Sequence, residues 1–212
     1  MRKAAGCFLI LLAWAAGAQG SPKAGRIFFS KSFPGSIPEY FAIEVEASGS
    51  ATYRESPAEE DPLRFTLSAS DTKEIFALAE KLQFFRKPLE SKLKLANMGM
   101  KLFRYEDGPV RNEVKFNFSE DPNARALADW FEKIGETERH RIALERAARF
   151  DRLGVNKALL ALEISWDNHR IVAPEQLLPV LDKIATQPNF VHIAQARAAS
   201  LAERIRTGKT AN

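Results

Sequence analysis

Two short motifs place a lysine at a spacing that supports chemistry. Residues 70–73 (Ser-Asp-Thr-Lys) have the Ser-x-x-Lys spacing, which brings a lysine one helical turn from a serine nucleophile in acyl-transfer enzymes. The companion Ser-Asp-Asn and Lys-Thr-Gly motifs do not occur in the sequence, and Asp71 with Glu74 also explains the segment as a helix capping box. Residues 207–210 (Thr-Gly-Lys-Thr) end like a phosphate-binding loop, but Glu203 stands where that loop needs its first glycine. Neither motif predicts a catalytic site.

Carboxylates and arginines also gather in two places. Glu44 and Glu46 share the polar face of a predicted strand, and they would act as general acid and base only if a cleft covered that face. Five arginines lie on one predicted helix, namely Arg139, Arg141, Arg146, Arg149 and Arg152. Such clusters grip phosphate or carboxylate groups. However, Glu145 is four residues from both Arg141 and Arg149, as in ordinary helix ion pairs. We therefore expect solvated faces at both places, with the arginines salt-bridged.

The histidines do not predict a metal site. The chain has three, His140, His169 and His192, and no two of them have the His-x-x-x-His or His-Glu-x-x-His spacing that brings zinc ligands together. Asp167 shares a predicted turn with His169, and His192 would approach both if the second and fourth helices of the C-terminal half pack together. The sequence predicts no catalytic residue, no metal and no cofactor.

Aromatic residues near the N-terminus stand out, because the sequence has 15 phenylalanines and most of the others fall on periodic core positions. Several of the early ones flank a loop rich in serine, lysine, proline and glycine. Exposed aromatic loops often form recognition surfaces. The candidate recognition residues are Phe28, Phe29, Phe33, Ile37 and Tyr40. The alternative is that these side chains pack beneath a sheet.

The elements that position these residues follow from hydrophobic periodicity. Apolar residues alternate with polar ones where one face of a strand is buried. This pattern predicts strands at 26–30, 41–47, 51–55, 63–67, 100–105 and 113–118. Residues 106–109 (Glu-Asp-Gly-Pro) predict a hairpin between the last two strands. Apolar residues spaced three and four apart predict helices at 71–85 and 121–134, with Asp71 and Asp121 at their starts.

The second half of the sequence lacks strand signals. Its apolar residues predict four helices, at 136–153, 155–166, 174–187 and 189–205, with Gly135 loosening the junction before the first and Asn189 capping the last. The fold class predicted is α+β: an antiparallel sheet with two helices, followed by an all-α helical-hairpin domain. The predicted organisation is a signal peptide at 1–20, a sheet domain at 21–137, a helical domain at 138–207 and a disordered tail at 208–212.

The segment around the first loop resembles an uncharacterised exported bacterial domain family of unknown function. Residues 35–40 (Gly-Ser-Ile-Pro-Glu-Tyr) are similar to the Gly-x-Cys-Pro-x-Tyr stretch that precedes a strand in that family. In the family this strand is followed by a glycine turn that ends in a tyrosine, and Gly49 and Tyr53 match these two positions. The resemblance covers about residues 26–137. Ile37 stands where the family often has cysteine, so a cysteine-based role is lost. The resemblance implies a fold but no activity.

The first 20 residues have the three parts of a secretory signal. Arg2 and Lys3 precede an apolar run, and small residues near Ala18 offer a cleavage site between Ala18 and Ser21. The alternatives are an uncleaved anchor and lipidation at Cys7. Cys7 is the only cysteine and leaves with the signal, so the mature chain can form no disulfide. Removal of Arg2 and Lys3 from 31 basic residues leaves 29 against 27 acidic ones, a net charge of +2.

A nearly neutral mature chain predicts no nucleic-acid partner. The export signal predicts a periplasmic or extracellular protein, with membrane attachment only through an uncleaved signal. Since no motif predicts catalysis, the sequence favours a non-catalytic module that binds a protein or an envelope component. An exported hydrolase and a small-molecule carrier or sensor with a sheet–helix cleft remain the alternatives. The sequence does not indicate an oligomeric state.

Overall fold

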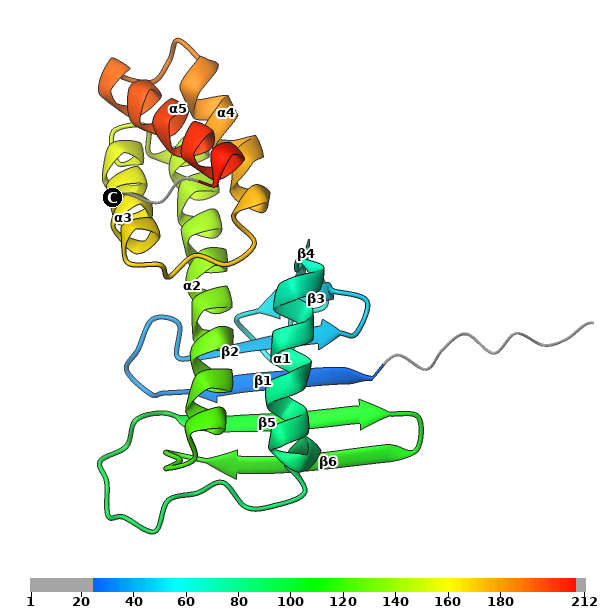
Figure 1. The fold of residues 1–212 in the computed structure, drawn as a ribbon. Helices are drawn as coiled ribbons and strands as arrows, with labels where there is room; N and C mark the ends of the chain where they lie inside the picture. The colour runs from blue at the N-terminus through cyan, green and yellow to red at the C-terminus, as the bar shows by residue number, and fades with distance from the viewer. Residues whose placement is uncertain (1–24, 209–212) are drawn as a thin grey trace, which may run out of the picture.

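Six strands form one antiparallel sheet in the computed structural model, which describes residues 25–208 (Figure 1). They are β1 (Arg26–Ser32), β2 (Tyr40–Glu46), β3 (Ser50–Arg54), β4 (Leu63–Thr66), β5 (Met100–Asp107) and β6 (Val110–Phe116). The order across the sheet is β4-β3-β2-β1-β5-β6, which makes β1 a central strand and β4 and β6 the edges. The predicted α+β class is confirmed.

The hairpin between β5 and β6 is tighter than the sequence predicts. Gly108 and Pro109 alone connect the strands, and Asp107 pairs with Val110. Gly108 has a φ of +57°, a conformation that two-residue hairpin loops reserve for glycine. β6 therefore starts at Val110 rather than at residue 113. Its first residues do not alternate clearly because β6 is an edge strand whose early side chains are largely exposed.

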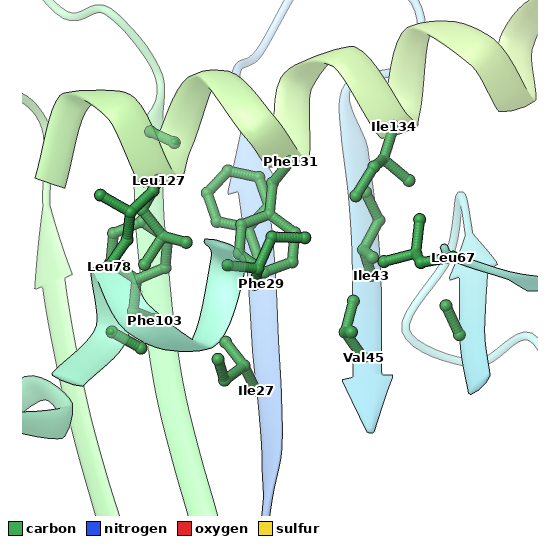
Figure 2. Close-up of a cluster of buried hydrophobic side chains, with 14 of the residues drawn as sticks. Ile27, Phe29, Ile43, Val45, Leu67, Leu78, Phe103, Leu127, Phe131 and Ile134 are labelled. Atoms are coloured by element: carbon green, nitrogen blue, oxygen red, sulfur yellow. The ribbon is translucent and has the colours of Figure 1, made fainter. Parts of the chain in front are cut away.

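One face of the sheet carries the first hydrophobic core. Helices α1 (Ala69–Lys81) and α2 (Pro122–Phe150) cover this face, as Figure 1 shows. The side chains of Leu127, Phe131 and Ile134 point from α2 towards the strands (Figure 2). Phe29 of β1 is fully buried and stacks on Phe131, with ring centroids 4.9 Å apart. Aromatic packing between the central strand and α2 thus holds the helix on the sheet.

The start of α1 differs from the prediction by three residues. Ser68, not Asp71, is the N-cap, and its side chain accepts a hydrogen bond of 3.1 Å from the backbone N–H of Asp71. Serine and aspartate are about equally good caps, so the sequence alone does not decide between them. After α1, the 3₁₀ turn η1 (Gln83–Phe85) leads into the long connection to β5.

Helix α2 is one uninterrupted helix of 29 residues, whereas the sequence predicts two helices that meet at Gly135. Gly135 does not break it. A Cβ atom at this position would lie 3.0 Å from the ring of Phe41, so the missing side chain lets β2 approach the helix. Asp121 caps the start of α2 as predicted, since its carboxylate accepts a 2.8 Å hydrogen bond from the N–H of Asn123.

The C-terminal half of α2 belongs to a second hydrophobic core. Helix α3 (Val155–Asp167), the 3₁₀ turn η2 (Pro174–Leu177), α4 (Leu178–Thr186) and α5 (His192–Thr207) complete this core. The N-cap of α5 is Val191 rather than Asn189, and no side chain caps it. The helical second half is therefore confirmed, with one shared helix in place of a junction.

The two cores share α2, so the predicted boundary between residues 137 and 138 falls inside this helix. Val172 and Ala173, which precede η2, return to the first core. Among the described residues, all members of both cores lie between Ile27 and Ile205, so a chain starting at Ser21 keeps every core residue that the structure describes. The predicted signal peptide, its cleavage site and Cys7 lie outside the described residues. No described helix is both long and apolar enough to span a membrane.

Candidate functional site

The loop between β1 and β2 is held in shape by its own hydrogen bonds. The N–H of Phe33 donates to the carbonyl of Glu39 at 2.8 Å and closes the base of the loop. The Ser36 hydroxyl lies 2.7 Å from the carbonyl oxygens of both Phe33 and Pro38. This arrangement leaves Ile37 97% exposed at the tip. A large apolar side chain held in solvent by a tied loop is a feature of contact surfaces.

A groove of about 540 Å³ runs between this loop and the helical half. Figure 1 shows the loop and α3 on the same side of α2. The apolar lining consists of Ile37 and Pro38 from the loop, Ile142, Ala143 and Ala147 from α2, and Ala158 and Ala161 from α3. Ala143 and Ala147 are one helical turn apart, so they form a shallow floor along α2. The groove is open to solvent, unlike the enclosed pockets that hold small ligands.

Positive charge borders this groove. Arg139, Arg146 and Lys157 line it, and none of the three forms an ion pair with a described residue. Two acidic residues also line the groove, and each has one carboxylate oxygen in a hydrogen bond within the protein. Asp151 accepts a 2.9 Å hydrogen bond from the N–H of Gly154, and Glu55 accepts one of 2.9 Å from the Tyr53 hydroxyl. The groove therefore combines an apolar floor with three cations and two carboxylates, which leaves an excess of positive charge for an anionic partner.

A smaller hollow of about 220 Å³ adjoins the groove and shares Ile37, Pro38 and Arg139 with it. Phe33 and Phe41 contribute its aromatic lining. The guanidinium carbon of Arg139 lies 5.9 Å from the centre of the Phe41 ring, within the range of a cation–π contact. This contact positions Arg139 between the two hollows.

The five candidate recognition residues separate into three places. Phe33 and Ile37 lie at the hollows beside the loop, with Phe33 partly exposed. Phe28 and Tyr40 lie on the opposite face of the sheet, because they alternate with the core residues of β1 and β2. Phe29 belongs to the core, and its inclusion in a recognition surface is wrong. Phe28 is covered by Arg104, whose guanidinium carbon lies 4.2 Å from the ring centre.

The arginine-rich face of α2 is only partly salt-bridged. Arg141 bonds Glu145 as predicted, with its Nε 3.1 Å from the carboxylate. The predicted pair of Glu145 with Arg149 does not form, and among the described residues Glu145 pairs with Arg141 alone. Sequence spacing predicts which residues face each other, but it does not predict which of two equivalent arginines takes a shared acid. The prediction of a salt-bridged face is therefore wrong for most of these arginines.

A polar cluster between α2 and α3 has the residue types of a hydrolytic triad, and the sequence analysis did not predict it. The Ser165 hydroxyl donates to Glu136 at 2.7 Å. His140 Nε2 lies 2.9 Å from the same Ser165 Oγ. Because a carboxylate can only accept, the Ser165 hydroxyl donates to Glu136, which leaves the serine oxygen to accept from the imidazole N–H. Burial lowers the pKa of His140, so the ring is held neutral. Arg170 extends the cluster by donating to Glu136 at 3.0 Å.

This cluster joins α3 and its following loop to α2. Arg170 also donates to Asp129 at 2.6 Å, and the N–H of Val172 donates to Thr137 Oγ1 at 3.0 Å. The bonds cross from the end of α3 to the middle of α2 and fix the chain where it passes between the two cores. Because each of these polar groups has a hydrogen-bond partner, we interpret the cluster as a structural clamp that holds α3 and its following loop on α2.

Glu138 is fully buried near the clamp. Its nearest cation is Arg141, with Nη1 3.7 Å from the carboxylate. Burial raises the pKa of Glu138 to about 7, and Arg141 offsets only part of this effect. Glu138 lines none of the hollows beside the β1–β2 loop, so its effect is on stability rather than on binding.

The other chemical candidates do not assemble a site. Ser70 Oγ lies 2.8 Å from Ser68 Oγ at the helix cap. Glu44 pairs with Arg26 at 3.3 Å on the open face of the sheet. Asp167 pairs with Arg204 rather than with a histidine. Within residues 25–208, no cluster of three or more potential metal ligands occurs.

No protein-family model matches this chain, and a search of curated proteins also finds no match. The resemblance to an exported bacterial domain family over residues 26–137 therefore stays a prediction. The groove must be interpreted from its own geometry and charge.

Proposed function

We propose that this protein is an exported, non-catalytic interaction module whose groove between α2, α3 and the β1–β2 loop binds an acidic amphipathic helix of another protein. The observation that carries the proposal is the pairing of an alanine-rich apolar floor with three cations, Arg139, Arg146 and Lys157, that have no described ion-pair partner. Helix-in-groove recognition needs both an apolar track and a polar rim that sets orientation.

The shape of the floor favours a helix over an extended chain. Two helices that pack side by side leave a valley between them, and α2 and α3 line this valley with Ala143, Ala147, Ala158 and Ala161. Small side chains let a third helix approach to the usual interaxial distance of about 8–10 Å. An extended chain that binds by strand addition would instead need a free sheet edge, and no residue of the edge strands β4 and β6 lines the groove.

The charge of the rim selects the partner. A partner with acidic residues on either side of its apolar stripe would place carboxylates near Arg139 and Arg146 on α2 and Lys157 on α3. Rim charges act mainly on association rate and specificity, and each exposed pair contributes about 0.2–1 kcal/mol. Affinity is then expected to fall as salt concentration rises.

The proposed location is the periplasm or the extracellular space, on the strength of the N-terminal signal. The described fold is compatible with export, since its stability rests on two packed cores and on no disulfide. In this location the partner would be another exported protein or the exported part of an envelope protein.

Binding of a designed peptide tests the proposal. The probe is a fluorescent amphipathic helix with leucines on one face and glutamates beside them, and its lysine-substituted counterpart is the control. The chain from Ser21 should bind the acidic helix more tightly than the basic one in an anisotropy titration. Ala143→Trp fills the floor and should abolish binding. Arg125→Gln, on the same helix but outside the groove, should have no effect. Equal binding of both peptides would contradict the proposed function.

A further inference from the structure

Four apolar side chains are exposed at one end of the helical half. Phe150 and Leu153, at the connection between α2 and α3, are 81% and 85% exposed. Val191 and Ile193, at the start of α5, are 47% and 58% exposed. Side chains of this size are rarely left so open in groups on a soluble protein without a contact to make.

The two pairs lie at the same end because α3 and α5 run side by side in the same direction. Arg197 of α5 donates to Asn156 near the start of α3, and Arg204 of α5 pairs with Asp167 at its end. Ile193 is one turn before Arg197, and Leu153 is three residues before Asn156. Figure 1 shows this end of the helical half as the one farthest from the sheet.

Two arginines accompany the apolar group. Arg149 precedes Phe150 and Arg152 precedes Leu153 in the sequence, and both arginines are exposed without an ion pair to any described residue. The nearest acid along the chain, Asp151, is bonded to the N–H of Gly154. This end surface, defined here as Arg149, Phe150, Arg152, Leu153, Val191 and Ile193, is therefore apolar and positive.

We propose that the end surface docks onto an anionic lipid bilayer. Phenylalanine, leucine, valine and isoleucine side chains would enter the boundary between headgroups and acyl chains, and the two arginines would contact lipid phosphates. In an anionic bilayer the negative charge of the headgroups lies about one side-chain length above the apolar layer, so one surface can contact both. Four apolar side chains and two charges give reversible attachment, far weaker than a spanning helix.

The inference is independent of the peptide groove, because no residue of the end surface lines it. The proposed membrane contact is also separate from the predicted attachment through an uncleaved signal, because the end surface is part of the folded helices. An exported protein that binds a partner in its groove would then hold that partner at a membrane surface.

Vesicle co-sedimentation tests the inference with the chain from Ser21, which lacks the apolar N-terminal run. The probes are vesicles of phosphatidylcholine alone and of equal parts phosphatidylcholine and phosphatidylglycerol. The protein should bind the anionic vesicles only, and binding should weaken with added salt. Phe150→Ser with Leu153→Ser should lower the affinity at least tenfold. Arg149→Gln with Arg152→Gln should lower it about 25-fold, since each charge near an anionic surface is worth about fivefold.

Three controls separate the outcomes. Ile37→Ser removes an apolar side chain at the groove that is more exposed than those of the end surface, and it should leave vesicle binding unchanged. Leu93→Ser with Leu95→Ser changes two exposed residues before β5. Loss of vesicle binding in this pair, and not in the end-surface variants, would overturn the assignment to the end surface.

Sedimentation equilibrium tests the end surface for self-association. A dimer that Phe150→Ser with Leu153→Ser dissociates, together with no vesicle binding, would also overturn the inference. Peptide binding by the groove should persist in all the end-surface variants.

Discussion

Gly135 lies directly against the ring of Phe41. A Cβ atom at Gly135 would be 3.0 Å from Cε2 of that ring and 3.3 Å from Cδ2. This closeness brings the middle of α2 onto β2, and it fixes the helix relative to the β1–β2 loop that precedes this strand. The position of the groove therefore depends on a residue that sequence reasoning interprets as a break in the helix.

Substitution of Gly135 by leucine should destabilise the protein by about 1–3 kcal/mol, because the added atoms would press against the buried Phe41 ring. The matched control is Ala143→Leu, at an exposed position two turns later in α2. The control should change the free energy of unfolding by less than about 0.5 kcal/mol. Urea denaturation measures both. Equal effects of the two substitutions would show that Gly135 does not set the packing distance.

Phe29→Ala should destabilise the protein by about 3–5 kcal/mol, as expected for a fully buried phenylalanine. Phe29 contacts the rings of Phe41, Phe103 and Phe131, with centroids 4.9–5.8 Å away. Ile37→Ala should leave stability almost unchanged, since its side chain is in solvent. Thermal unfolding of the two variants distinguishes a core residue from a surface residue among the original recognition candidates.

Glu138→Gln should make stability less dependent on pH. The pKa of Glu138 is raised from 4.5 to about 7 in the folded protein, so between these values the folded state holds a proton that the unfolded state releases. Stability of the natural protein should therefore fall as pH rises from about 4.5 to about 7. Above pH 7 the glutamine variant should be the more stable by about 3 kcal/mol.

The measurement is the difference in unfolding free energy between the natural protein and Glu138→Gln at pH 4, 6 and 8. Taking the difference removes the opposite contribution of His140, whose lowered pKa costs stability as the pH falls below about 6.5. A constant difference across this range would mean that Glu138 is not held protonated.

Ser165→Ala should cost about 1–3 kcal/mol, because it leaves Glu136 and His140 without their shared partner. The same change should leave peptide binding unaltered at a temperature where the variant is folded. Loss of an enzymatic activity in Ser165→Ala, measured on a panel of ester and amide substrates, would contradict the interpretation of this cluster as a clamp.

The sequence predicts most elements well because their periodicity is regular. The alternation of Phe41, Ile43 and Val45 reflects one buried face of β2, and all three are buried. The prediction fails where a tertiary contact overrides a local signal. Gly135 is unfavourable in an isolated helix, yet it lets the Phe41 ring approach to a distance at which a Cβ atom would make a tight contact.

The groove was only partly predictable. Ile37 is identifiable from its place in a loop rich in turn residues. The alanines of the floor carry no chemical signal, because alanine is common in any helix. Their importance depends on the packing of α3 beside α2, which brings Ala158 and Ala161 opposite Ala143 and Ala147. The lack of an ion pair between Arg139 and any described residue likewise depends on the tertiary structure, since its spacing in the sequence suggests ordinary helix ion pairs.

Site-specific photocrosslinking tests the central claim most directly. The full-length chain is produced in the native host with benzoylphenylalanine at Ala143 or Ala161. It should crosslink to a partner whose attached segment, mapped by mass spectrometry, is an acidic amphipathic helix. The same group at Arg125 should give no such product. Crosslinking from the groove only to extended or basic segments, or no protein crosslink at either groove position, would contradict helix binding in the groove.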